Sequence, residues 1–301
     1  MLMNSISYPP TNKRNKTNKQ SIYLRRLIIS AVFLSIALTL RTLTSLYIPL
    51  FGENAMRINI GGIFSIMPSI LFGPFFGGLT SGLSDFIGFQ LRPSGQYVFL
   101  HTLFVAGGGA IRGGLWLFLR NKNPRIIRNI IIAFATVLLL FGSTNIIMLH
   151  RDNITPYSLE NYDISDNIYF MSRFIITRSQ NAANPATMFR TTTVSVGIAP
   201  IVAGVFGYLL VIIDFFISKK LLQYSIMPLL LAMLTSSIIV NTLNTILFRA
   251  TIFPAWQLLP FFVVWLPRVL QTIITTTIYS YFVAFLLNLC KAQKEFNSLV
   301  V

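Results

Sequence analysis

Long apolar segments recur along almost the whole chain and constrain its fold more than any other feature. Hydrophobic residues make up 54% of the sequence and charged residues 11%, whereas soluble domains carry about 25% charged residues. A backbone in lipid must satisfy its own hydrogen bonds, so such segments cross the membrane as helices. We therefore predict an all-α fold, a polytopic membrane helical bundle in a lipid bilayer. Its helices are expected over the ranges 25–49, 60–73, 75–91, 97–119, 126–149, 192–217, 224–249 and 256–288.

The second and third of these segments, 60–73 and 75–91, are too short to span about 30 Å upright at a rise of about 1.5 Å per residue. We expect them to form a tight hairpin or to line a cavity. Gly73-Pro74 ends one helix and starts the next, because Pro suits the first turn of a helix. Small residues then recur along 77–88, a spacing that lets helix backbones approach closely in lipid.

The basic residues predict the topology. Eight helices that start from a cytoplasmic N-terminus place all eight lysines on the cytoplasmic side, in agreement with the positive-inside rule. Both termini are then cytoplasmic in a multi-pass protein of the cell membrane. The net charge of +16 is explained by this bias and by contact with anionic lipid, so we do not expect nucleic-acid binding.

The chain divides into a transmembrane helical domain, 24–290, and two cytoplasmic tails. Residues 1–23 are polar, basic and rich in Asn, and we expect them to be disordered, with no signal peptide. Residues 291–301 form the other tail. The outer segment 150–191 is long and polar, and it is either a mobile surface loop or a lid over an outward-facing site.

Ionisable residues inside helices are costly in hydrocarbon and should face protein, a cavity or the interface. Arg112 and Asp214 lie near predicted cytoplasmic ends, where snorkelling or capping explains them. Arg41 and Arg249 lie near the outer boundary, where the same explanation applies. Asp85 lies in the small-residue stripe and Arg268 follows Pro267. For Asp85 and Arg268, a functional role and an internal ion pair remain equal alternatives.

The sequence lacks the motifs of common enzymes. It has no His-Glu-x-x-His run, no Gly-x-Ser-x-Gly elbow and no phosphate-binding loop. One cysteine and two histidines, His101 and His150, make a metal centre unexpected. We expect no cofactor and no catalytic residue. The glycines at 107–109 and 113–114 lie mid-helix, without the strand that a dinucleotide site needs, and indicate helix packing.

Three stretches together resemble the S components of energy-coupling factor (ECF) vitamin transporters, and most of all the folate-type branch. They are Leu71–Gly78, Gly82–Gly88 and Arg92–Tyr97, which contain the motif residues Gly73, Pro74, Asp85, Pro93 and Gly95. Asn244-Thr245-Ile246-Leu247, or Asn241-Thr242-Leu243, is similar to a segment of that branch's fifth helix. Leu266-Pro267-Arg268 is similar to a segment of its sixth helix.

This resemblance implies a six-helix subunit that captures a vitamin and passes it to a transmembrane coupling subunit with two ATPase subunits. It would not be an enzyme. Arg268 would bind a substrate carboxylate, and Asp85 would organise the hairpin. The remaining implied contacts are stacking on a flat ring by Tyr97, Phe99 and His101, hydrogen bonds from Asn241 or Asn244, and a coupling-subunit contact at Ala31 and Ser35. For the aromatic residues, ordinary helix packing is the alternative.

The chain departs from this family in several places. Val98-Phe99-Leu100-His101 replaces a Phe-Pro-Gly-Phe pattern, Gln271 stands where a lysine is expected, and Arg112 stands where an aromatic residue is usual. An insertion over 121–221 adds two transmembrane helices and the outer loop 150–191. Two other functions remain open: an intramembrane enzyme that acts on lipid or peptide through Asp85, and a structural subunit with no ligand.

Overall fold

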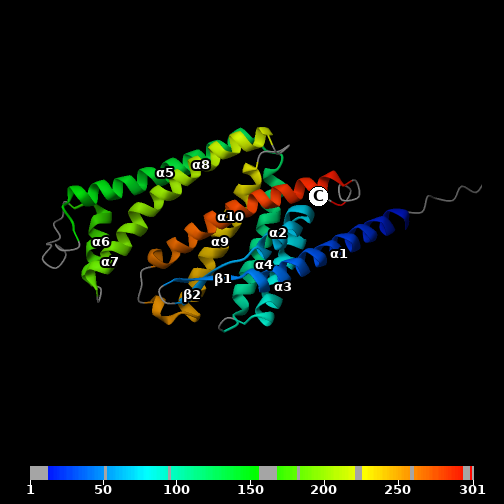
Figure 1. Ribbon diagram of the computed structural model, residues 1–301, viewed down its shortest axis with the longest axis horizontal. Helices are drawn as coiled ribbons and strands as arrows, with labels where there is room; N and C mark the ends of the chain where they lie inside the picture. Colours follow the sequence, from blue (N-terminus) through cyan, green and yellow to red (C-terminus); the bar gives the residue numbers. More distant parts are fainter. Residues whose placement is uncertain are drawn as a thin grey trace, which may run out of the picture.

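The computed structural model describes residues 13–50, 53–93, 96–155, 168–181, 184–220, 226–257, 261–293 and 299. Within these residues the protein is a helical bundle with one small β-hairpin (Figure 1). The helices are α1 (Lys13–Thr44), α2 (Gly61–Phe72), α3 (Pro74–Leu91), α4 (Phe99–Leu119), α5 (Pro124–Arg151), α6 (Phe170–Gln180), α7 (Pro185–Thr193), α8 (Ala199–Lys220), α9 (Met227–Thr251) and α10 (Phe261–Ala292).

Six helical stretches of the described chain are long and apolar enough to cross a membrane, which confirms the polytopic membrane fold. They cover Gln20–Thr44, Phe99–Leu119, Pro124–Arg151, Pro185–Phe216, Met227–Thr251 and Val264–Ala292. Helix α2 is shorter, and most of its residues are buried. It packs through Met67 and Ile70 into a core that includes Met227 and Met233 of α9. Because protein surrounds α2, it has no need to span the bilayer.

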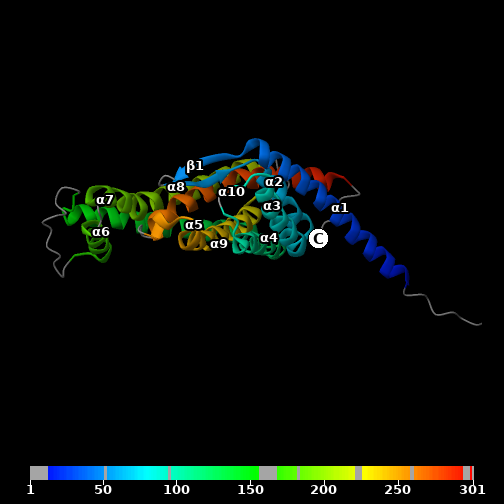
Figure 2. The same ribbon diagram turned by 90° about the horizontal axis from the view of Figure 1, so that it is seen from below.

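The bundle has two parts of different shape. Helices α2, α3, α4, α9 and α10 pack together. Helix α1 runs beside α2 and α3, and its N-terminal half projects beyond them (Figure 1). Helices α5 and α8 form a long pair that extends in the opposite direction, with α6 and α7 at its far end (Figures 1 and 2). This second part is formed by described residues between 124 and 220.

Two expectations for the first third of the chain are wrong. Helix α1 begins at Lys13, so residues 13–23 are helical, while 1–12 lie outside the described residues. Helix α1 also ends at Thr44, and β1 (Leu46–Leu50) pairs antiparallel with β2 (Glu53–Ile58). Pro49 disfavours a helix through this segment, because it lacks the N–H that would bond to the Ser45 carbonyl. It lies at the irregularity in register between Ile48 and Leu50.

The segment 150–191 contains more structure than the sequence predicts. Helices α6 and α7 occupy much of 150–191, and 156–167 lie outside the described residues. Asn184 begins α7, since its side chain accepts a hydrogen bond from the Thr187 N–H at 3.3 Å, and Pro185 follows in the first turn. A π-helical turn, Val194–Ile198, then joins α7 to α8. The helix expected to start at residue 192 thus starts at 185.

The predicted break and close packing of the small-residue hairpin are confirmed. Gly73 has a φ of +88°, which favours glycine, and Pro74 is the first residue of α3. A Cβ on Gly77 would meet the backbone oxygen of Gly109 on α4, and a Cβ on Gly113 would meet the backbone at Gly73. Helices α3 and α4 therefore touch through their backbones, as small residues allow in lipid.

Two of the ionisable residues near helix ends have local structural roles. Asp214 is fully buried, and its Oδ1 accepts a hydrogen bond from the Ile226 N–H at 3.1 Å, at the start of α9. Arg249 donates to the carbonyl oxygens of Trp256 and Gln257, each at 3.0 Å. Both contacts satisfy backbone groups that a helix end leaves open. Of the two explanations offered for Asp214, snorkelling and capping, this contact supports capping, at the start of α9.

Candidate functional site

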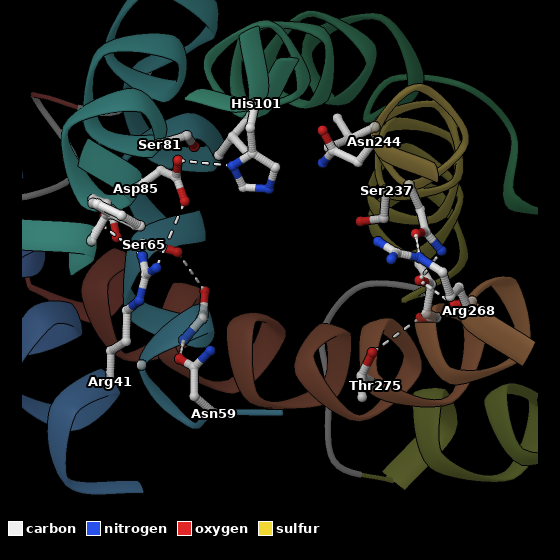
Figure 3. A pocket seen from close by; sticks show the side chains of 18 of the residues that line it. Arg41, Asn59, Ser65, Ser81, Asp85, His101, Ser237, Asn244, Arg268 and Thr275 are labelled. Carbon is white, nitrogen blue, oxygen red and sulfur yellow. Dashed lines mark hydrogen bonds and ion pairs between the residues drawn. The ribbon is translucent and has the colours of Figure 1, made fainter. Parts of the chain in front are cut away.

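A cavity of about 450 Å³ lies between α1–α4 on one side and α9 and α10 on the other. Residues 96–98, which precede α4, also line it. Its charged lining residues within the described chain are Arg41, Asp85, Arg112 and Arg268. Figure 3 shows Arg41 and Asp85 on one wall and Arg268 on the facing wall, with open space between them. Such a volume suits a small organic ligand, since ligand sites are about 300–1,000 Å³.

Asp85 is the centre of the first wall. Its carboxylate accepts hydrogen bonds from the Thr102 hydroxyl at 2.8 Å and pairs with His101 Nδ1 at 3.0 Å. The Arg41 guanidinium lies 3.6 Å from the other carboxylate oxygen and donates to the Ser84 carbonyl at 2.7 Å. One carboxylate thus ties α1, α3 and α4 together. Of the alternatives left open for Asp85, these contacts support a packing role within the cavity wall.

A glycine on the neighbouring helix α3 leaves room for the Arg41 side chain in the cavity wall. A Cβ on Gly88 would collide with the guanidinium of Arg41. The glycine therefore admits the long side chain between α1 and α3, where it reaches Asp85. The Arg41 side chain is 12% exposed, and the expected snorkelling to the outer boundary is wrong.

Arg268 is fixed on the opposite wall. The residue is 7% exposed, and its Nε donates to the Asn241 side-chain oxygen at 3.1 Å. Its guanidinium lies 5.0 Å from the ring centroid of Phe248 and 5.7 Å from that of Trp256, within range of cation–π attraction. These contacts hold an arginine fork at the cavity, where it can bind a carboxylate in bidentate fashion.

The two asparagines proposed from the sequence have different surroundings. The Asn241 amide is used between helices, because it accepts from Arg268 and donates to the Thr272 hydroxyl at 2.9 Å. Asn244 is 5% exposed, and its Oδ1 is buried without a hydrogen-bond partner in the part of the chain that the structure describes. Both line the cavity, and of the two side-chain oxygens only that of Asn244 has no hydrogen-bond partner among the described residues.

The structure brings two of the three predicted aromatic residues to the cavity. Tyr97 lines it and packs against Phe89, with ring centroids 5.1 Å apart. His101 lines it and stacks on Phe248 at 5.2 Å with an interplanar angle of 18°. Phe99 is 67% exposed and does not line the cavity. At the first turn of α4 it points away from the bundle, and the expectation that it stacks on a ligand is not supported.

The other residues implied by the family resemblance lie on the surface or outside the residues that the structure describes. Ala31 and Ser35 are exposed on α1, where the Ser35 hydroxyl donates to the Ala31 carbonyl at 2.9 Å. That face of α1 is therefore open to a partner or to lipid. Pro93 is exposed after α3. Gly95 lies outside the described residues.

Several residues that line the cavity are not predicted from the sequence. Arg112 lines the cavity, and its Nε donates to Ser236 at 3.3 Å, so its side chain faces the protein interior and the expected snorkelling is wrong. On α10 a polar stripe continues from Arg268 toward the C-terminus. Its members Gln271, Thr272, Thr275, Thr276 and Tyr279 all line the cavity. Their spacing of three and four residues was a visible signal of one polar helix face. Asn59, Ser65 and Ser237 carried no such signal.

No cluster of three or more His, Cys, Asp or Glu side chains that could hold a metal ion occurs among the residues described. The comparisons add no family: no family model, no curated protein and no solved structure matches the chain. The class that fold and site define is therefore a multi-pass helical membrane protein with an internal, arginine-rich cavity.

We predict that Asp85→Ala lowers the stability of the protein strongly. The substitution removes the acceptor shared by Arg41, His101 and Thr102, and loss of one partner of a buried ion pair costs about 3–5 kcal/mol. Thermal unfolding in detergent measures the effect. Thr102→Val is the matched control, because it removes one of the three contacts of the same carboxylate together with the hydrogen bond between Thr102 and Tyr97, each worth about 1 kcal/mol. Equal unfolding temperatures for the two variants would contradict the role given to Asp85.

Proposed function

We propose that the protein is the substrate-binding membrane subunit, the S component, of an ECF-type vitamin importer. Its substrate would be folate or a related anionic vitamin, which it would pass to an ATPase-coupled partner. One observation carries the proposal: three arginines and one aspartate are the charged residues that line the cavity within the described chain. Arg41, Arg112 and Arg268 against Asp85 leave the cavity lining with two positive charges in excess, and a buried site of that kind favours an anion.

The shape and lining of the cavity support the same class of ligand. A volume of about 450 Å³ accommodates a vitamin-sized molecule. Tyr97 and the stacked pair of His101 and Phe248 place aromatic rings at the cavity, while Arg268 offers a fork to a carboxylate. The cavity is bounded by α10 and by the segment after Pro93, which argues against a purely structural subunit without a ligand site.

The proposal includes the partners and the location of the importer. Helix α1 exposes Ala31 and Ser35 together with Leu27, Ile28 and Val32, so an apolar face is available to a coupling subunit in the membrane. Two ATPase subunits would supply the energy of transport. The protein would lie in the cell membrane with both termini cytoplasmic, as the lysine positions predict.

Binding of radiolabelled folic acid to the purified protein tests the ligand. We expect saturable binding that unlabelled folic acid displaces, because the cavity can neutralise carboxylates and stack a ring. Affinity purification from native membranes tests the class, with recovery of a coupling subunit and ATPases as the expected result. Absence of saturable binding removes the folate assignment, and absence of both partners in a stable preparation removes the importer class.

A second candidate, an intramembrane enzyme acting through Asp85, is favoured by one observation. His101 Nδ1 lies 3.0 Å from the Asp85 carboxylate, and a carboxylate–imidazole pair can act as a general base. The importer proposal expects no turnover of lipid or peptide by the purified protein in vesicles. Release of product that disappears in a stable Asp85→Asn variant would favour the enzyme instead.

A further inference from the structure

His101 is held in one orientation at the cavity wall. Its Nδ1 lies 3.0 Å from Asp85 Oδ2, and its ring stacks on Phe248 at 5.2 Å. With Nδ1 turned to Asp85, the second ring nitrogen, Nε2, is directed into the cavity (Figure 3). The side chain is 28% exposed, so this nitrogen is accessible to a molecule in the cavity.

Asp85 sets the tautomer of His101. The carboxylate already accepts a hydrogen bond from Thr102 at 2.8 Å and faces the Arg41 guanidinium at 3.6 Å, so it is held in the ionised form. An ionised carboxylate has no proton to donate, and the hydrogen between it and His101 must therefore belong to Nδ1. A neutral imidazole carries one such hydrogen, which leaves Nε2 as an unprotonated acceptor.

Asn244 lies on the cavity wall opposite His101 and carries a second acceptor. It comes from α9, and Figure 3 shows its amide group facing His101 across the cavity. Its Oδ1 is buried and makes no hydrogen bond to any described residue. Buried polar atoms are normally paired, so this acceptor gains a partner if its amide turns toward a donor that a ligand brings into the cavity.

We infer that His101 Nε2 and Asn244 Oδ1 form a recognition point for N–H groups of the bound molecule. Phe248 lies beside this point, and its ring contacts both His101 and the Arg268 guanidinium. The ligand class is thus an organic anion whose planar group also carries N–H donors. The inference deepens the proposed function and rests on it, because it names the chemistry of a ligand of the same cavity.

The first part of the test needs no ligand. The chain has two histidines, so His150→Gln leaves His101 as the one imidazole, and His150 is exposed at the end of α5. Nitrogen NMR of ¹⁵N-histidine-labelled protein in nanodiscs at neutral pH should show a protonated Nδ1 and an unprotonated Nε2. With Asp85→Asn, both tautomers should be populated. A protonated Nε2 in the protein that retains Asp85 would overturn the inference.

The second part compares folic acid with its analogue that lacks the 2-amino group. The wild type should bind folic acid about tenfold more tightly, because a site built for an N–H group rejects a molecule without one. His101→Ala and Asn244→Ala should each reduce that preference. Because there are two variants, the test still works if one of them does not fold. An unchanged preference in both overturns the inference. If folic acid does not bind while Nε2 is unprotonated, the folate assignment falls and the acceptor assignment stands.

Discussion

Replacement of Arg268 by alanine should lower the affinity for labelled folic acid by about 30-fold to several thousand-fold. This range corresponds to about 2–5 kcal/mol, the cost of truncating one partner of a buried, hydrogen-bonded charge pair. Arg268 can have an effect of this size because it is 7% exposed and fixed by Asn241, Phe248 and Trp256. A fixed guanidinium loses little side-chain entropy when the ligand carboxylate arrives.

Two further variants separate a lost contact from a damaged fold. Arg268→Lys retains the charge but not the planar fork, so it should bind folic acid with an affinity between those of the wild type and of Arg268→Ala. Arg125→Ala removes an arginine that is exposed on α5, away from the cavity, and should leave binding unchanged. Equilibrium binding and thermal unfolding should be measured on all three. Wild-type affinity in a folded Arg268→Ala protein would remove Arg268 from the site.

The sequence predicts the membrane fold well because lipid imposes few solutions. Apolar segments of sufficient length must be helices, and the Gly73-Pro74 break follows from the backbone chemistry of those two residues. The predictions fail where contacts with distant parts of the chain decide the structure of a segment. Helix α1 ends at Thr44, before a hairpin that contains Pro49, and the polar segment 150–191 contains α6 and α7. A polar composition alone does not distinguish a loop from helices at the tip of a longer pair.

The cavity was only partly predictable for a related reason. Arg268, Tyr97, His101 and both asparagines reach it, and the helical spacing along α10 would have identified more of its residues. Arg41 and Arg112 were assigned to the membrane boundary, because a position near the end of a helix usually permits snorkelling. Which neighbour accepts such a charge depends on helix packing. Gly88 admits Arg41, and no pattern within either helix indicates that contact.

The close contact of α3 and α4 should make Gly109→Ala one of the most destabilising single-carbon additions in the chain. A Cβ on Gly109 would collide with the backbone of Gly77 and with the Ser81 hydroxyl. Backbone cannot move aside as a flexible side chain can, so the helices must separate. Such overpacking costs about 1–3 kcal/mol, and occasionally more.

Gly107→Ala is the matched control on the same helix. Nothing lies within 4 Å of a Cβ placed there, so the added methyl group meets open space. Alanine also favours a helix interior over glycine by about 0.5–1 kcal/mol. Gly107→Ala should therefore match or exceed the wild-type unfolding temperature, while Gly109→Ala should unfold several degrees lower. Fluorescence-detected thermal unfolding in detergent measures both.

The same comparison links packing to ligand binding. Helix α3 carries Asp85 and α4 carries His101, so separation of the two helices would lengthen the 3.0 Å contact that orients the imidazole. Gly109→Ala should then weaken folic acid binding as well as stability, whereas Gly107→Ala should leave binding unchanged. Equal stability of the two variants would show that α3 and α4 are not in backbone contact, and the position of Asp85 in the cavity wall would then lack its structural basis.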